Sequence, residues 1–126
     1  MKKAIRFASL TIACLTVAFL ALPQSNHDSL DSLKVCSATQ KLMFENEFVR
    51  VIDDQIPVGV AEPLHSHPRG VVIYLTTSTF ETVTQGGKKI VSQRKEGTAL
   101  WSEVTVHTVK NVGKAPAHAI RIELKY

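Results

Sequence analysis

The chain has 126 residues, of which 44% are hydrophobic and 21% are charged, and its formal net charge is +4. This length allows one domain with a single core and is too short for two. Three of the 15 basic side chains (Lys2, Lys3 and Arg6) lie at the N-terminus, so the rest of the chain, with its 11 acidic side chains, is close to neutral. Because it also has no basic stripe with interleaved aromatic residues, the composition argues against nucleic-acid binding.

Residues 1–25 have the order of a secretory signal peptide. A basic start precedes an uncharged apolar run from Phe7 to Leu22, and Pro23 ends that run. At about sixteen residues the run is shorter than the ~20 that a bilayer core needs, which favours cleavage over a retained anchor. A lipoprotein start at Cys14 is another alternative, but apolar sequence continues past it. We therefore expect residues 1–25 to be cleaved and the mature protein to be periplasmic or secreted, without membrane contact.

Residues 26–40 are polar with scattered leucines and are expected to form an N-terminal arm with at most one turn of helix. The arm contains Cys36, which is the only cysteine after residue 25 and so has no internal disulfide partner. We interpret this cysteine as structural or incidental.

From Lys41 onward the sequence reads as short strands separated by turns. The expected strands are rich in β-branched and aromatic residues and cover 42–44, 48–52, 62–67, 71–75, 80–84, 89–92, 105–109 and 117–124. The Gly86-Gly87 pair between two of these runs is a strong hairpin signal. The continuous apolar run at 71–75 predicts a strand buried on both faces. This spacing, without helical periodicity, predicts an all-β sandwich or closed barrel over residues 41–126.

The strand expected at 117–124 shows the clearest alternation. Its apolar face holds His118, Ile120, Ile122 and Leu124, and its other face holds Ala117, Ala119, Arg121 and Glu123. We expect the isoleucine face to point into the barrel. That orientation places His118 inside, either as a hydrogen-bonded core histidine or as a cavity residue and ligand.

Three histidines have the spacing of a metal site. His65 and His67 are two residues apart in an extended segment, and such side chains point to the same side of a strand. His107 lies on another expected strand, from which it can converge with them on one ion inside a barrel. Imidazole is the commonest protein ligand for borderline first-row metals. The alternative is three histidines without a shared ligand.

These motifs resemble those of the cupin superfamily. Gly59–His67 looks like the first half of the first cupin motif, a glycine, five residues and His-x-His, and His107–Asn111 matches the His-x-x-x-Asn that closes the second. Gly97 stands close to the position of the glycine that opens the second motif. The resemblance covers residues 41–124, is strongest to small secreted single-domain bacterial cupins, and implies a double-stranded β-helix, or jelly roll, of six to eight strands. Asn111 itself is expected to be structural, capping the turn after its strand.

The resemblance implies that the three histidines are metal ligands, but it does not imply a fourth ligand. Cupins with a glutamate ligand place it four or five residues after the second histidine, where this chain has Val71 and Val72. The second motif also reads Ser102-Glu103-Val104 in place of its usual Pro-x-Gly. Three neutral imidazoles favour divalent Fe, Ni, Cu or Zn over Mg or Ca, and they leave coordination positions open for a small-molecule ligand.

Other residues near the motifs are candidates for the cavity or its surroundings. Tyr74 and Trp101 are either cavity-lining groups or ordinary aromatic fillers. Arg69 either meets an anionic substrate or is a solvated loop charge. Arg50 and Glu62 are candidates for a buried pair.

Three functions are compatible with these residues, and whether the protein is an enzyme stays open at this level. The first is a metal-dependent oxygenase or isomerase that acts on a small molecule. The second is a module that binds a small molecule or a metal without turnover. The third is a degenerate cupin whose cavity is filled by Val71, Val72 and Tyr74. The missing glutamate counts against the first function, and the three retained histidines count against the third. A homodimer with residues 26–40 at the contact is also expected.

Overall fold

The computed structural model describes residues 29–126, so the predicted signal segment lies outside the described residues. This part contains one short helix, α1 (Ser32–Val35), and nine strands. The strands are β1 (Gln40–Glu45), β2 (Val49–Ile56), β3 (Ala61–His67), β4 (Gly70–Tyr74), β5 (Ser78–Thr84), β6 (Lys89–Arg94), β7 (Ala99–Ser102), β8 (Thr105–Asn111) and β9 (Ala117–Leu124). The all-β prediction is confirmed, with one strand more than the expected maximum because β7 was not predicted.

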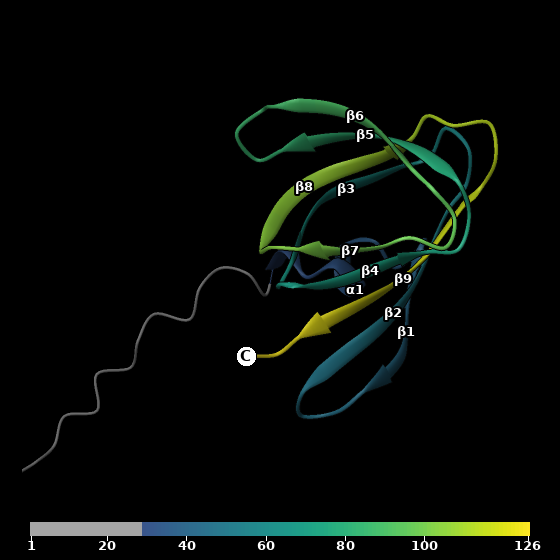
Figure 1. Ribbon diagram of the computed structural model, residues 1–126. Helices are drawn as coiled ribbons and strands as arrows, with labels where there is room; N and C mark the ends of the chain where they lie inside the picture. The colour runs from purple at the N-terminus through teal and green to yellow at the C-terminus, as the bar shows by residue number, and fades with distance from the viewer. Residues whose placement is uncertain (1–28) are drawn as a thin grey trace, which may run out of the picture.

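The strands form two antiparallel sheets that face each other (Figure 1). The five-stranded sheet has the order β1-β2-β9-β4-β7, and the four-stranded sheet has the order β3-β8-β5-β6. Strands that are distant in the sequence are neighbours, since β2 pairs with β9 from Val49↔Leu124 to Ile56↔Ala117. This arrangement is the predicted jelly roll, or double-stranded β-helix. Within residues 29–126, no helix has the length and apolar character needed to cross a bilayer.

The inward face of β9 is the opposite of the one predicted. Its buried positions are Ala117, Ala119, Arg121 and Glu123. The residues between them are half-buried on the outer face of the sheet, where Ile122 lies between Val51 of β2 and Val71 of β4. Apolar side chains that pair across neighbouring strands stabilise a sheet even when they do not face the interior. The isoleucine face of β9 therefore lies on the outer face of the sheet. The face that carries Arg121 and Glu123 points into the barrel.

His118 consequently points away from the interior. Its Nε2 atom lies 2.6 Å from Oδ1 of Asp53, on the outer face of the same sheet. The prediction that His118 lies inside the barrel is wrong, because it followed from the inverted face of β9.

A small apolar core lies beside the polar interior. Ile56, Phe80 and Ala117 are buried together, and Tyr74 and Val109 pack against them. The Tyr74 and Phe80 ring centroids are 6.2 Å apart. Tyr74 therefore packs against this core as a filler, and it also lines the cavity described below, so both of its predicted alternatives apply in part.

Two local expectations have different outcomes. The predicted hairpin joins β5 to β6, and Gly87 in its turn has φ +81°, in the left-handed region that favours glycine. The strand predicted to be buried on both faces is instead half-buried from Val71 to Tyr74. Its side chains alternate between the barrel interior and the outer face of the sheet, so neither set is fully enclosed.

The segment that leads into β1, up to its first residue Gln40, packs against the barrel and includes the predicted turn of helix. Asp31 caps α1 and pairs with Arg50, whose Nη1 lies 2.6 Å from Asp31 Oδ2. Thr39 and Gln40 both donate hydrogen bonds to Oε1 of Glu62 on β3. This segment therefore fixes side chains that face the interior.

Asn111 holds the end of β8 in place. Its Nδ2 atom donates to the carbonyls of Ile56 and Ala115, both at 2.9 Å, and its Oδ1 accepts from the Gly113 amide at 2.9 Å. The residue is fully buried. Its predicted structural role is confirmed.

Replacing Asn111 with alanine is expected to lower the free energy of unfolding by about 2–4 kcal/mol, because three hydrogen bonds are lost and the buried carbonyl of Ile56 loses a donor. Urea denaturation measures this loss. Asn46→Ala is the matched control, since Asn46 accepts from two backbone amides in an exposed turn and should contribute only about 1 kcal/mol. Equal losses for the two variants would contradict the role assigned to burial.

Candidate metal centre

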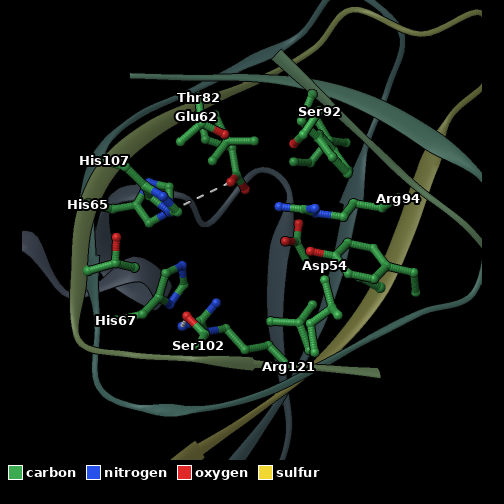
Figure 2. Close-up of a pocket in the computed structure, with 18 of the residues that line it drawn as sticks. Asp54, Glu62, His65, His67, Thr82, Ser92, Arg94, Ser102, His107 and Arg121 are labelled. Carbon is green, nitrogen blue, oxygen red and sulfur yellow. Dashed lines mark hydrogen bonds and ion pairs between the residues drawn. The ribbon is translucent and has the colours of Figure 1, made fainter. Parts of the chain in front are cut away.

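Three imidazole rings meet on the inner face of the four-stranded sheet (Figure 2). His65 on β3 lies directly opposite His107 on β8, because the two residues are register partners. The ring centroids are 4.7 Å apart for His65 and His67, 4.7 Å for His65 and His107, and 5.6 Å for His67 and His107. One ring nitrogen from each residue lies within 4.8 Å of the other two. The structure thus brings together the three histidines that the sequence singled out.

Two of the rings are oriented by hydrogen bonds at Nδ1. The Nδ1 atom of His65 lies 2.7 Å from the carbonyl oxygen of Pro63, and that of His67 lies 2.6 Å from Oε1 of Glu123. Both partners accept hydrogen bonds, so in the neutral imidazole the proton is on Nδ1 and the lone pair is on Nε2. The Nε2 of His65 is buried and has no hydrogen-bond partner within residues 29–126. A lone pair in this situation fits a metal ion.

Burial holds His67 and His107 in the neutral form. It lowers the pKa of His67 well below its usual range, and the Arg121 guanidinium, His65 and Arg50 act in the same direction. It also lowers the pKa of His107 to about 3, again with contributions from His65, His67 and Arg121. Because a metal binds the unprotonated imidazole, these two rings stay ready for a metal at neutral and mildly acidic pH.

In the presence of a chelator, His107→Gln is expected to lose less stability on acidification than the wild type. The unfolded chain takes up a proton on His107 below its ordinary pKa of 6.5, whereas the folded chain resists protonation down to about 3. Stability is therefore lost as pH falls through this window, by up to about 1.4 kcal/mol per pH unit for this residue. Glutamine does not titrate and removes that loss.

Urea denaturation of both proteins at pH 6.5 and at about pH 4.5 measures the effect, with an expected difference in acid-induced loss of about 2 kcal/mol. An equal loss of stability in the two proteins would contradict the lowered pKa of His107.

Glu123 links His67 to two arginines. Arg50 Nε donates to Oε2 of Glu123 at 2.8 Å, and Arg121 Nε lies 3.4 Å from Oε1. Glu123 is fully buried. Its charge is balanced by both guanidiniums, so it orients the His67 ring without drawing a second proton onto it. The predicted pair of Arg50 with Glu62 is wrong, because Arg50 binds Glu123 and Asp31 instead.

Two further acids point into the same space (Figure 2). Glu62 reaches it because a register shift between Glu62 and His65 lets both residues face the interior. Its Oε2 atom lies 3.8 Å from His65 Nε2. Burial raises the pKa of Asp54 well above its usual range, and the neighbouring Glu62 raises it further. Glu62 therefore brings a carboxylate near the histidines from a position that the family pattern does not use.

Cys36 lies close to this group but is not reactive. It is buried, and burial together with the carboxylates of Glu62 and Asp54 raises its pKa to about 12. Its Sγ lies within 4.8 Å of one ligand atom each of Glu62 and His65. Without a bound metal, however, a thiol with this pKa stays protonated and is a poor nucleophile. The structural interpretation of Cys36 is therefore retained.

The imidazoles open onto a cavity of about 250 Å³ between the two sheets. Tyr74 and Trp101 line this cavity, which was one of the two alternatives predicted for each of them. His118, which was also predicted as a cavity residue, does not line it. Val72 lines the wall near the position where the fourth ligand of the family would stand. Arg69 is exposed in the loop after His67 and is not among the lining residues, which supports its interpretation as a solvated loop charge.

The sequence interpretation missed four charged residues of this site. They are Asp54, Arg94, Arg121 and Glu123. Arg121 and Glu123 share a strand face with two alanines, and alternation alone does not say which face is inward. Asp54 and Arg94 stand in no recognisable motif, so their place at the site follows only from the strand pairing.

No protein-family model matches the sequence, and no curated protein matches it. Solved structures match it well. A cupin domain from Bordetella pertussis is 27% identical and aligns with a TM-score of 0.64 over 69% of this chain and 92% of its own. An RmlC-like cupin with a double-stranded β-helix fold from Methanocaldococcus jannaschii is 14% identical, with a TM-score of 0.55 over 68% of this chain and 77% of its own. A polyketide cyclase from Streptomyces resistomycificus is 11% identical, with a TM-score of 0.52 over 69% of this chain and 64% of its own.

Proposed function

The chain belongs to the cupin superfamily, and we propose that it binds a divalent transition metal through His65, His67 and His107 and holds a small molecule against that metal. The buried Nε2 of His65 carries this proposal. It has no hydrogen-bond partner within the described part of the chain, Glu62 Oε2 lies 3.8 Å away, and Pro63 fixes its ring. A buried acceptor without a partner is unfavourable, and a metal ion would satisfy it.

The donor set decides which metals fit. Three neutral imidazoles suit Fe, Ni, Cu and Zn, while Mg and Ca prefer oxygen ligands. Glu123 holds the His67 ring in place through Nδ1, as carboxylates commonly do for metal-bound histidines. Bound there, the metal would supply Lewis-acid or redox activation to a small molecule at an open coordination position.

We favour an oxygenase or isomerase acting on a small molecule, and a binding module without turnover is the alternative. The cavity of about 250 Å³ supports either function. It disfavours the degenerate cupin, since Val71 faces outward and the interior is not filled. The polyketide cyclase among the structural neighbours is an enzyme on this fold, but a fold does not by itself define a reaction.

The metal is tested on the purified protein after chelation and reloading with nickel, zinc, iron or copper. Elemental analysis should give about one ion per chain for the wild type and almost none for His65→Ala/His107→Ala. His118→Ala is the matched control, because it removes a histidine on the outer face and should leave the metal content unchanged. Equal metal content in the wild type and the double variant would overturn the proposal.

Turnover is tested by oxygen consumption of the iron- or copper-loaded protein with catechols, flavonols and thiols. Consumption that disappears in the double variant supports an oxygenase. Metal binding without consumption favours the isomerase or the binding module, and isomerisation of the same compounds, followed by their absorbance, separates those two.

We also propose that residues 1–25 are cleaved and that the protein works in the periplasm or outside the cell. Their basic, apolar and polar order supports this. The intact mass of the protein from a periplasmic or secreted fraction should correspond to a chain that begins between residues 22 and 26. Recovery of the full-length mass there would contradict cleavage.

A further inference from the structure

Arg94 is a cation in the cavity without an acidic partner. It stands at the end of β6, is half-buried and lines the cavity. Figure 2 shows its side chain reaching into the cavity from the side opposite His65 and His107. Its guanidinium carbon lies 6.0 Å from the centroid of the Tyr74 ring. Across residues 29–126 its side chain forms no hydrogen bond or ion pair.

The other two arginines that face the interior differ in this respect. Arg50 binds Glu123 and Asp31. Arg121 donates to Ser102 Oγ at 3.1 Å and pairs with Glu123. The interior therefore provides acceptors for its structural arginines and leaves Arg94 with donors available to a ligand.

The charge of the site favours an anion at this point. Three neutral imidazoles do not balance a divalent ion, and Arg94 adds a further positive charge to the cavity. Glu62 and Asp54 also line this cavity, but burial favours the neutral form of Asp54, so the metal-loaded site stays positive. A half-buried guanidinium is also more favourable when a carboxylate takes its donors, because the planar fork forms two parallel charge-assisted hydrogen bonds. Ser92 lies two residues before Arg94 on the same face of β6 and offers a hydroxyl beside it.

We propose that Arg94 binds the carboxylate of a small organic acid whose second donor group points toward the three histidines. The contact between the ligand and the metal rests on the proposed function. The contact between the ligand's carboxylate and Arg94 does not depend on the metal. The cavity of about 250 Å³ limits the ligand's size. That volume is small for a ligand pocket, and it fits a short hydroxy, oxo or thiol acid.

The test measures binding by calorimetry to the nickel-loaded and the metal-free protein. The probes are malate and 3-mercaptopropionate, compared with dimethyl malate and methyl 3-mercaptopropionate, which lack the negative charge and keep the hydroxyl or thiol donor. Arg94→Met removes the guanidinium and Arg94→Lys keeps a charge. Arg69→Met is the matched control, because Arg69 is exposed outside the cavity. Elemental analysis and thermal unfolding of each variant verify metal content and folding.

At least one acid should bind the wild type about 10- to 100-fold more tightly than its ester. Arg94→Met should abolish that preference with metal content unchanged, Arg94→Lys should keep part of it, and Arg69→Met all of it. Acid binding that depends on Arg94 in the metal-free protein would sustain this inference even if the metal proposal failed. Failure of both acids to bind a nickel-loaded wild type, equal binding of acids and esters, or an unchanged preference in Arg94→Met would overturn it.

Discussion

Replacing Glu123 with glutamine is expected to weaken metal binding by about 10- to 100-fold and to lower the free energy of unfolding by about 3 kcal/mol. Glu123 is fully buried and accepts from His67 Nδ1 at 2.6 Å and from Arg50 Nε at 2.8 Å. Glutamine keeps the shape but removes the charge that balances Arg50 and Arg121. It also no longer fixes the His67 ring through a carboxylate, which explains the expected loss of metal affinity.

Metal affinity is measured by calorimetry, and stability by urea denaturation of the chelated protein, so the two effects are separated. Glu81→Gln is the matched control, because its pair with Lys89 is largely exposed, with 61% of the lysine side chain accessible. An exposed pair of this kind contributes less than about 1 kcal/mol. A Glu123→Gln protein that is as stable as Glu81→Gln and binds metal as tightly would show that Glu123 does not support the site.

The three histidines could be predicted because their geometry follows from local rules. His65 and His67 share a face by the period of two in a strand, and this holds whatever the rest of the chain does. His107 required only that its own strand pair with theirs, which the family resemblance implied. In the structure, His107 is the register partner of His65.

The charged surroundings of the histidines could not be predicted in the same way. Alternation along β9 shows that the strand has two different faces, but it does not show which face points inward. The assumption that apolar residues face the interior therefore predicted the wrong orientation. Arg121 and Glu123 are favourable inside because they pair with each other and Glu123 also accepts a hydrogen bond from His67. Ile122 is favourable outside because both neighbouring strands present valine there. These partners are distant in the sequence, so only the topology brings them together.

The strand β7 was missed for a similar reason. Ala99–Ser102 is four residues long, and its mixed composition has no alternation that marks a strand. Pairing with β4 from Gly70↔Ser102 to Ile73↔Ala99 makes it extended. Short edge strands are defined by the neighbour they pair with more than by their own residues. The same pairing brings Trp101 and Ser102 to the cavity wall.

Replacing Gly70 with alanine is expected to lower the free energy of unfolding by more than about 4 kcal/mol, among the largest effects for one substitution. Gly70 pairs with Glu123 of β9 on one side and with Ser102 of β7 on the other. A Cβ atom on Gly70 would lie 2.0 Å from the carbonyl oxygen of Ile122, a distance that no relaxed contact allows. Because the obstacle is backbone, β4 and β9 must separate to admit a methyl group.

Soluble yield and urea denaturation of the chelated proteins measure this effect. Gly86→Ala is the matched control, since its nearest atom would be the Thr84 hydroxyl at 3.9 Å, and it should change stability by no more than about 0.5 kcal/mol. Moving β9 also displaces Glu123 from His67, so any Gly70→Ala protein that folds should bind metal more weakly than the wild type. A stable Gly70→Ala protein with unchanged metal affinity would show that β4 and β9 need not approach this closely, and that the Glu123 contact with His67 does not depend on their pairing.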